Sequence, residues 1–153
     1  MRSITVTQRA DVPFSLSVDL AERFFKRPHG LAVGPGRFLR ASVVQESAQI
    51  RDVTDDTMVH EALMLIWQSR MRLPLPDFHG LLTVRVWAPG TEISIRGSYV
   101  PPFGIAGQLF DSAIGWRIAR MTLQRLLRDV CAYLEAQHEK ERADRDAATA
   151  TRR

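Results

Sequence analysis

The feature that most constrains the fold is a long amphipathic stretch in the last third of the chain. Apolar residues recur there every three or four positions, the spacing of one face of an α-helix: Leu109, Ala113, Trp116, Leu123, Leu127, Val130 and Leu134. The pattern predicts a helix from about Ile105 to Gln137, roughly 50 Å long at 1.5 Å per residue. In its first half four further residues widen the apolar arc: Phe110, Ile114, Ile118 and Met121. We therefore expect that half to be the more enclosed.

Upstream of this helix, alternating apolar and polar residues predict an antiparallel sheet. One expected strand has Leu82, Val84 and Val86 on its inner face and ends at a turn signal in residues 88–91. The next strand has an inner set that begins at Ile93 and ends at Tyr99. Because a sheet with one apolar face must bury it, the long helix is a suitable partner for this sheet.

The first half of the chain predicts the remaining elements. Residues 39–44 predict a strand, and polar residues at 45–47 and 55–57 predict hairpins on either side of a strand at 48–53. Residues 59–67 have helical propensities, but the hairpin signal before them and Pro74 after them favour a strand. Residues 17–27 predict a short helix with Ser17 as a candidate N-cap. The expected order is strand, short helix, several antiparallel strands and a long C-terminal helix, which is an α+β fold.

Charge and composition exclude several classes of function. The formal net charge is +4, but acidic residues are interleaved with the basic ones, so we expect no nucleic-acid partner. No run approaches the roughly 18 to 20 apolar residues of a membrane span, so we expect no integral membrane association. The N-terminus has no apolar core of a secretory signal, and Cys131 is the single cysteine. We therefore expect a cytoplasmic protein without a disulfide framework.

The last sixteen residues differ in composition from the rest of the chain. They contain charged residues with Ala and Thr, apart from His138 at the start, and hold no residue that would build a core. We expect one domain over residues 1–137 and a charged, disordered tail over residues 138–153.

Two segments carry a family resemblance. Residues 97–107 read Gly-Ser-Tyr-Val-Pro-Pro-Phe-Gly-Ile-Ala-Gly and lead into Arg117-Ile118-Ala119 and Thr122, and residues 73–80 read Leu-Pro-Leu-Pro-Asp-Phe-His-Gly. The sequence resembles small bacterial members of the START-like (SRPBCC) superfamily, which also contains polyketide cyclases and Bet v 1 allergens. The resemblance implies a helix-grip fold, in which a curved antiparallel sheet wraps the long C-terminal helix and leaves an apolar cavity between them.

Residues that flank this expected cavity are candidates for ligand contact. They are five aromatic residues and one histidine: Trp67, Phe78, Tyr99, Phe103, Phe110 and His60. Large aromatic rings supply apolar contact area, and Tyr99 adds a hydroxyl that needs a partner. The same spacing also serves core packing, so the pattern leaves both roles open for each residue.

Candidates for catalysis are few. Only five residues suit acid–base chemistry: His60, Glu61, Asp77, His79 and Asp111. No spacing suggests a metal site, a phosphate-binding loop or a nucleophile elbow, so we expect neither a metal nor a cofactor. We expect the chain to bind a small hydrophobic or amphipathic molecule without bond chemistry. A polyketide aromatase/cyclase-like enzyme, a protein-interaction module and a homodimer remain open alternatives.

Overall fold

The computed structural model describes residues 2–26, 31–33, 39–49, 61–69, 77–100 and 114–150. The elements follow the order β1 (Arg2–Ala10), α1 (Phe14–Phe25), β2 (Leu31–Val33), β3 (Leu39–Gln49), β4 (Glu61–Ser69), β5 (Asp77–Trp87), β6 (Gly90–Val100) and α3 (Ile114–Ala150). This is the expected α+β order, and β4 confirms the strand assignment for residues 61–67 over the helical propensity of that segment.

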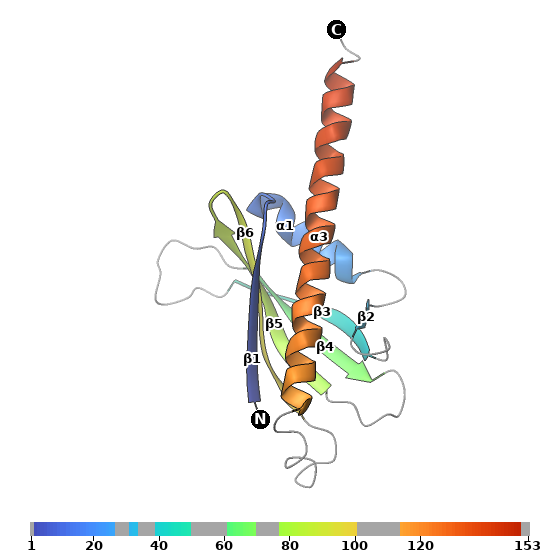
Figure 1. Cartoon of the computed structure of the whole chain (residues 1–153). Helices are drawn as coiled ribbons and strands as arrows, with labels where there is room; N and C mark the ends of the chain where they lie inside the picture. The colour runs from blue at the N-terminus through green and yellow to red at the C-terminus, as the bar shows by residue number, and fades with distance from the viewer. Residues whose placement is uncertain are drawn as a thin grey trace.

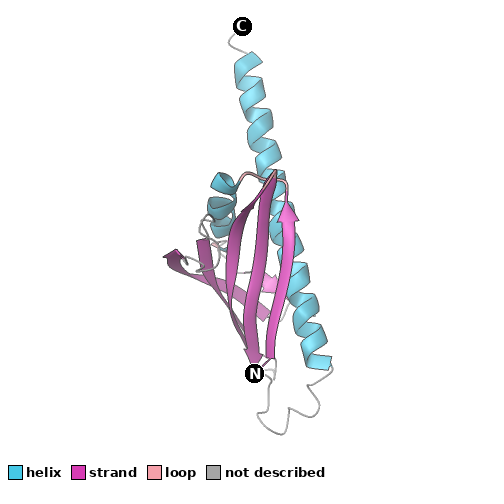
Figure 2. Ribbon diagram, turned by 90° about the vertical axis from the view of Figure 1, so that its left-hand side faces the viewer, coloured by secondary structure: helices cyan, strands magenta, loops and turns pink. Residues whose placement is uncertain are grey.

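The described strands form one antiparallel sheet, and the two described helices pack against it and against each other. Its order is β1-β6-β5-β4-β3-β2, so β1 is an edge strand. Helix α3 runs along β1 and β6, whereas α1 contacts β3, β5, β6 and α3. Figure 1 shows α3 crossing the whole sheet, and Figure 2 shows the strands on one side of it. The architecture is the helix-grip fold.

The core lies between the sheet and the two helices. Leu82 and Val84 of β5 and Ile93 and Ile95 of β6 are fully buried, as their alternation predicted. Val86, expected on the same inner face, is instead 45% exposed, because it lies next to the turn at the end of β5. The helix contributes its predicted stripe from Leu123 to Leu134 to the same cluster. Each such side chain contributes about 1.5–3 kcal/mol when fully buried, so this contact supplies most of the driving force for the fold.

Helix α1 is locked in place by a buried hydrogen-bond network. Its first residue is Phe14, with Pro13 at the N-cap position and no side-chain cap, so the expectation that Ser17 caps the helix was wrong. Ser17 lies instead within the first turns, where its Oγ is 3.0 Å from both the Pro13 carbonyl and Thr91 Oγ1. Thr91 Oγ1 in turn donates to the Val12 carbonyl at 2.6 Å. The network connects the N-terminal end of α1 to Thr91, the second residue of β6.

The described part of α3 differs from the expectation at two positions. Ile118 and Met121 were expected in the enclosed half, yet they are 40% and 67% exposed. The reason is geometric: at 3.6 residues per turn they lie about 140° and 160° around the helix from Leu123, which faces the core. Trp116 is half-buried and packs against the edge of the core cluster. Leu109, Phe110 and Ala113 lie outside the described residues.

Strand β3 also differs from the expectation. A hairpin was expected at residues 45–47, but β3 continues through them to Gln49. The pairing register with β4 shifts between Val44 and Ala48, so the polar run is accommodated as a bulge within one strand and not as a turn. The expected hairpin at 55–57 lies outside the described residues.

The C-terminal part of α3 projects beyond the sheet. The helix continues to Ala150, past the expected end near Gln137, and most of residues 139–150 are exposed. Figure 1 shows this part extending away from the strands to the C-terminus. The division into a domain of residues 1–137 and a tail of 138–153 stays a prediction. Neither described helix combines the length and the hydropathy needed to span a membrane.

Candidate functional site

Three of the six candidate ligand contacts stand in one row across the sheet. Trp67 of β4 pairs with Phe78 of β5, and Phe78 pairs with Tyr99 of β6. The row continues to Arg2 of the edge strand β1. Residues that are far apart in the chain are thus brought to neighbouring positions by the strand register. We call Trp67, Phe78 and Tyr99 the aromatic row.

Phe78 is the central residue of the aromatic row. Its side chain is fully buried, and its ring lies close above Gly80 and Gly97, which pair with each other across β5 and β6. A Cβ on Gly80 would come within 2.7 Å of Cε1 and Cζ of the ring, and one on Gly97 within 2.6 Å of the same Cζ. The two glycines are needed because any side chain there would displace the ring.

The aromatic row lies at the end of the sheet away from α1. Helix α1 is fixed to the start of β6 through Ser17 and Thr91, whereas Tyr99 and Arg2 lie at the other end of the β6–β1 ladder. Because α3 runs along β1 and β6, the row begins beside the helix at Tyr99 and continues away from it toward β4.

The other sequence candidates are placed only in part. His60, Phe103, Phe110 and Asp111 lie outside the described residues, as do the side chains of Trp67, Tyr99, Glu61 and Asp77. His79 is exposed. The six-residue ligand site therefore stays a prediction, supported so far by the register of three of its members.

Buried polar chemistry in the described interior is sparse. Cys131 is buried, and its burial, with a smaller effect of the Glu135 charge, raises the pKa of the thiol to about 12. It is therefore a thiol at neutral pH and a poor nucleophile. Ser17 and Thr91 are held in the network with Pro13 and Val12. Among the described residues no group of three or more His, Cys, Asp or Glu could hold a metal ion.

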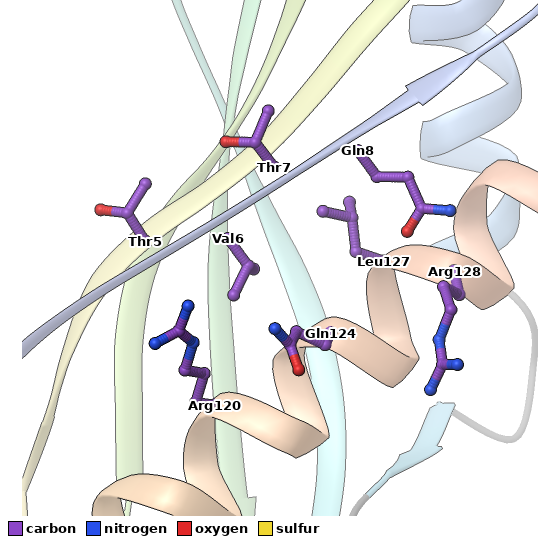
Figure 3. Close-up of a pocket in the computed structure, with 8 residues that line it drawn as sticks. All are labelled: Thr5, Val6, Thr7, Gln8, Arg120, Gln124, Leu127 and Arg128. Carbon is purple, nitrogen blue, oxygen red and sulfur yellow. The ribbon is translucent and has the colours of Figure 1, made fainter.

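A second site lies at the edge of the sheet, between β1 and α3. It is a groove of about 410 Å³ lined by residues of these two elements: Thr5, Val6, Thr7, Gln8, Arg120, Gln124, Leu127 and Arg128. Figure 3 shows Val6 and Gln8 on the side of β1 that faces α3, Thr5 and Thr7 on its other side, and Arg120 reaching from α3 toward the strand. We call it the edge groove.

The edge groove was not among the sites predicted from the sequence. Arg120, Gln124 and Arg128 recur at intervals of four residues, which places them in a single stripe beside the apolar face of α3. That spacing was a visible signal for a polar strip. It did not reveal a groove, because only the fold shows that the edge strand β1 lies next to this strip.

Comparisons with known proteins support the fold. No known protein-family model matches the sequence, and no curated protein is similar to it in sequence. The solved structure of TTHA0849 from Thermus thermophilus is similar, with a TM-score of 0.52 and 11% identity over 89% of this chain and 99% of that one. The di-domain ARO/CYC BexL from the BE-7585A biosynthetic pathway gives a TM-score of 0.49 and 14% identity over 90% of this chain and 50% of BexL, so this chain spans about half of BexL.

At these identities the likeness to TTHA0849 concerns the fold alone. Together with the sheet order and the long C-terminal helix, it supports the helix-grip fold that the START-like resemblance implied.

Proposed function

We propose that this protein binds a small hydrophobic or amphipathic molecule between the inner face of the sheet and α3, without bond chemistry. The observation that carries the proposal is the aromatic row. Trp67, Phe78 and Tyr99 occupy directly opposed positions on three neighbouring strands, and Phe78 is buried on the inner face together with Leu82 and Leu65. Side chains at directly opposed positions are close enough to form one contact surface.

The energetics favour an apolar ligand. Burial of about 200 Å² of apolar ligand surface contributes about 5 kcal/mol at 25 cal/mol per Å². Part of this gain is offset by the lost freedom of the ligand. An amphipathic ligand adds a polar group, for which the Tyr99 hydroxyl is the proposed hydrogen-bond partner.

The described interior supports binding over catalysis. General acid–base chemistry needs at least one titratable side chain within reach of the substrate. The buried residues of β5 and β6 that face the core are aliphatic or aromatic apart from Thr91, and Thr91 is engaged with Val12. Cys131 keeps its proton because burial raises its pKa to about 12.

The test uses two tryptophan variants of the full chain. Binding of 1-anilinonaphthalene-8-sulfonate is measured by fluorescence titration for the parent protein, Trp67→Leu and Trp87→Leu. Trp87 is the matched control, because it is 42% exposed and its ring packs under the Arg9 guanidinium at 3.9 Å. We expect Trp67→Leu to weaken probe binding at least threefold and Trp87→Leu to leave it unchanged. Native mass spectrometry of the parent protein checks for a co-purified small molecule.

Two results would contradict the proposal. One is equal probe binding by all three proteins when circular dichroism shows that each is folded. The other is probe binding that Tyr99→Phe and Trp67→Leu both leave intact, since the aromatic row would then not contact the probe.

A further inference from the structure

In the edge groove, the outer edge of β1 lies beside the polar strip of α3, which consists of Arg120, Gln124 and Arg128. Strand β1 pairs with β6 on one side, and among the described strands no other lies on its second side. An edge strand turns the N–H and C=O groups of alternate residues away from its sheet, where they can pair with another chain. Here that free edge runs beside the groove lined by Thr5, Thr7 and Gln8 of β1 and by three polar residues of α3.

We propose that the edge groove binds an extended acidic segment of another protein, which adds to the sheet as a strand beside β1. Arg120 and Arg128 are both exposed, and the residues that line the groove include no acidic side chain. Arg120 also lies against the Trp116 ring, 5.2 Å from its centroid, which limits the orientations of its guanidinium. A segment with carboxylates on one face matches this charge.

The spacing of the two arginines specifies the pattern of the segment. Eight residues of α-helix separate them by about 12 Å at 1.5 Å per residue. In an extended strand, side chains four residues apart lie on the same face and about 13 Å from each other. Val6 and Leu127 supply an apolar floor within the same groove. The matching segment is therefore acidic at its first and fifth positions and apolar at its third.

Charge argues against a second copy of this chain as the occupant. Residues 2–10 contain Arg2 and Arg9 and no acidic residue. A second β1 strand would therefore offer no carboxylate to Arg120 or Arg128 of either copy, and it would bring further basic residues to this edge. An acidic partner thus fits the charge of the edge and a second copy of this chain does not.

The test is a binding measurement with short labelled peptides on the full chain. The probe is fluorescein-Glu-Thr-Val-Thr-Glu-amide, followed by fluorescence anisotropy at low salt, and its control carries Lys in place of each Glu. We expect the acidic probe to bind with a dissociation constant below about 1 mM and the basic control not to bind. Arg120→Gln and Arg128→Gln should each weaken binding about two- to fivefold, the range for exposed ion pairs. Arg125→Gln is the matched control, because Arg125 is exposed on α3 and does not line the groove.

Backbone methylation separates strand addition from simple ion pairing. Two forms of the probe are methylated on the backbone nitrogens of odd or of even residues. In an added strand only alternate N–H groups point toward β1, so we expect one form to lose binding and the other to keep it.

Three outcomes would overturn the proposal. They are equal binding of the two methylated forms, equal losses for Arg125→Gln and Arg120→Gln, and no binding of the acidic probe up to about 1 mM, the weakest affinity considered. A stable dimer in analytical ultracentrifugation that Thr5→Pro or Thr7→Pro dissociates would also overturn it, because a second copy would then occupy the edge. None of these readouts depends on the ligand proposed for the aromatic row.

Discussion

The two hydroxyls of the buried network, those of Ser17 and Thr91, differ in how much stability their hydrogen bonds contribute. Thr91 donates to the Val12 carbonyl at 2.6 Å and also accepts from Ser17. The Pro13 carbonyl has other donors, since the backbone N–H groups of Leu16 and Ser17 reach it at 3.1 and 3.2 Å. Thr91 and Ser17 are both fully buried, as is Val12. The loss in the free energy of unfolding can therefore be estimated separately for removal of each hydroxyl.

We predict that Thr91→Val destabilises the protein more than Ser17→Ala. The valine has nearly the same shape but leaves the buried Val12 carbonyl without this donor, at a cost of about 1–3 kcal/mol. Ser17→Ala removes a hydroxyl and leaves Thr91 bonded to Val12, so it costs about 0.5–1.5 kcal/mol. For a chain of this length 1 kcal/mol corresponds to about 2–4 °C in Tm, so the two variants are distinguishable.

The assay is urea unfolding of the parent, both single variants and the double variant, followed by circular dichroism. Because the Ser17–Thr91 bond is shared, the double variant should lose less stability than the sum of the singles, by at least about 0.5 kcal/mol. The reasoning is refuted if Ser17→Ala costs as much as Thr91→Val, or if the two effects simply add.

Three further predictions concern α3. Cys131 should react with a disulfide reagent far more slowly in the native protein than in urea. Its folded-state pKa of about 12 against an ordinary 9.0 also means that stability present below pH 9 is lost as the pH rises from 9 toward 12, which unfolding at stepped alkaline pH measures. Trp116→Ala should cost about 2 kcal/mol, below the 3–5 kcal/mol of a fully buried ring, because Trp116 is half-buried; an unchanged urea midpoint would contradict this. Deletion of residues 141–153 should leave Tm within about 2 °C, since little apolar surface is buried there; a larger drop in a thermal scan would mean that this segment docks.

Local patterns predicted the fold wherever one element determines its own buried face. The alternation in β5 and β6 placed Leu82 and Ile95 correctly, because residue parity sets the face of the strand on which a side chain lies. Parity does not tell where the cover of that face ends, and Val86 near the end of β5 is exposed. The same reasoning failed for Ile118 and Met121. The width of an apolar arc on a helix does not predict how much of the arc is covered. The covered part depends on which strands α3 contacts.

The two candidate sites differ in what the sequence makes visible. The members of the aromatic row could be named in advance, because large aromatic residues near a predicted cavity are few, but the register that aligns Trp67, Phe78 and Tyr99 is a property of pairing between distant segments. The edge groove could not be named at all. Its basic strip is visible as Arg120, Gln124 and Arg128 on one helix, but a strip becomes a groove only beside a strand whose second edge is open. That depends on β1 taking the outer place in the sheet, and the first strand of a chain shows no local sign of whether later strands will enclose it.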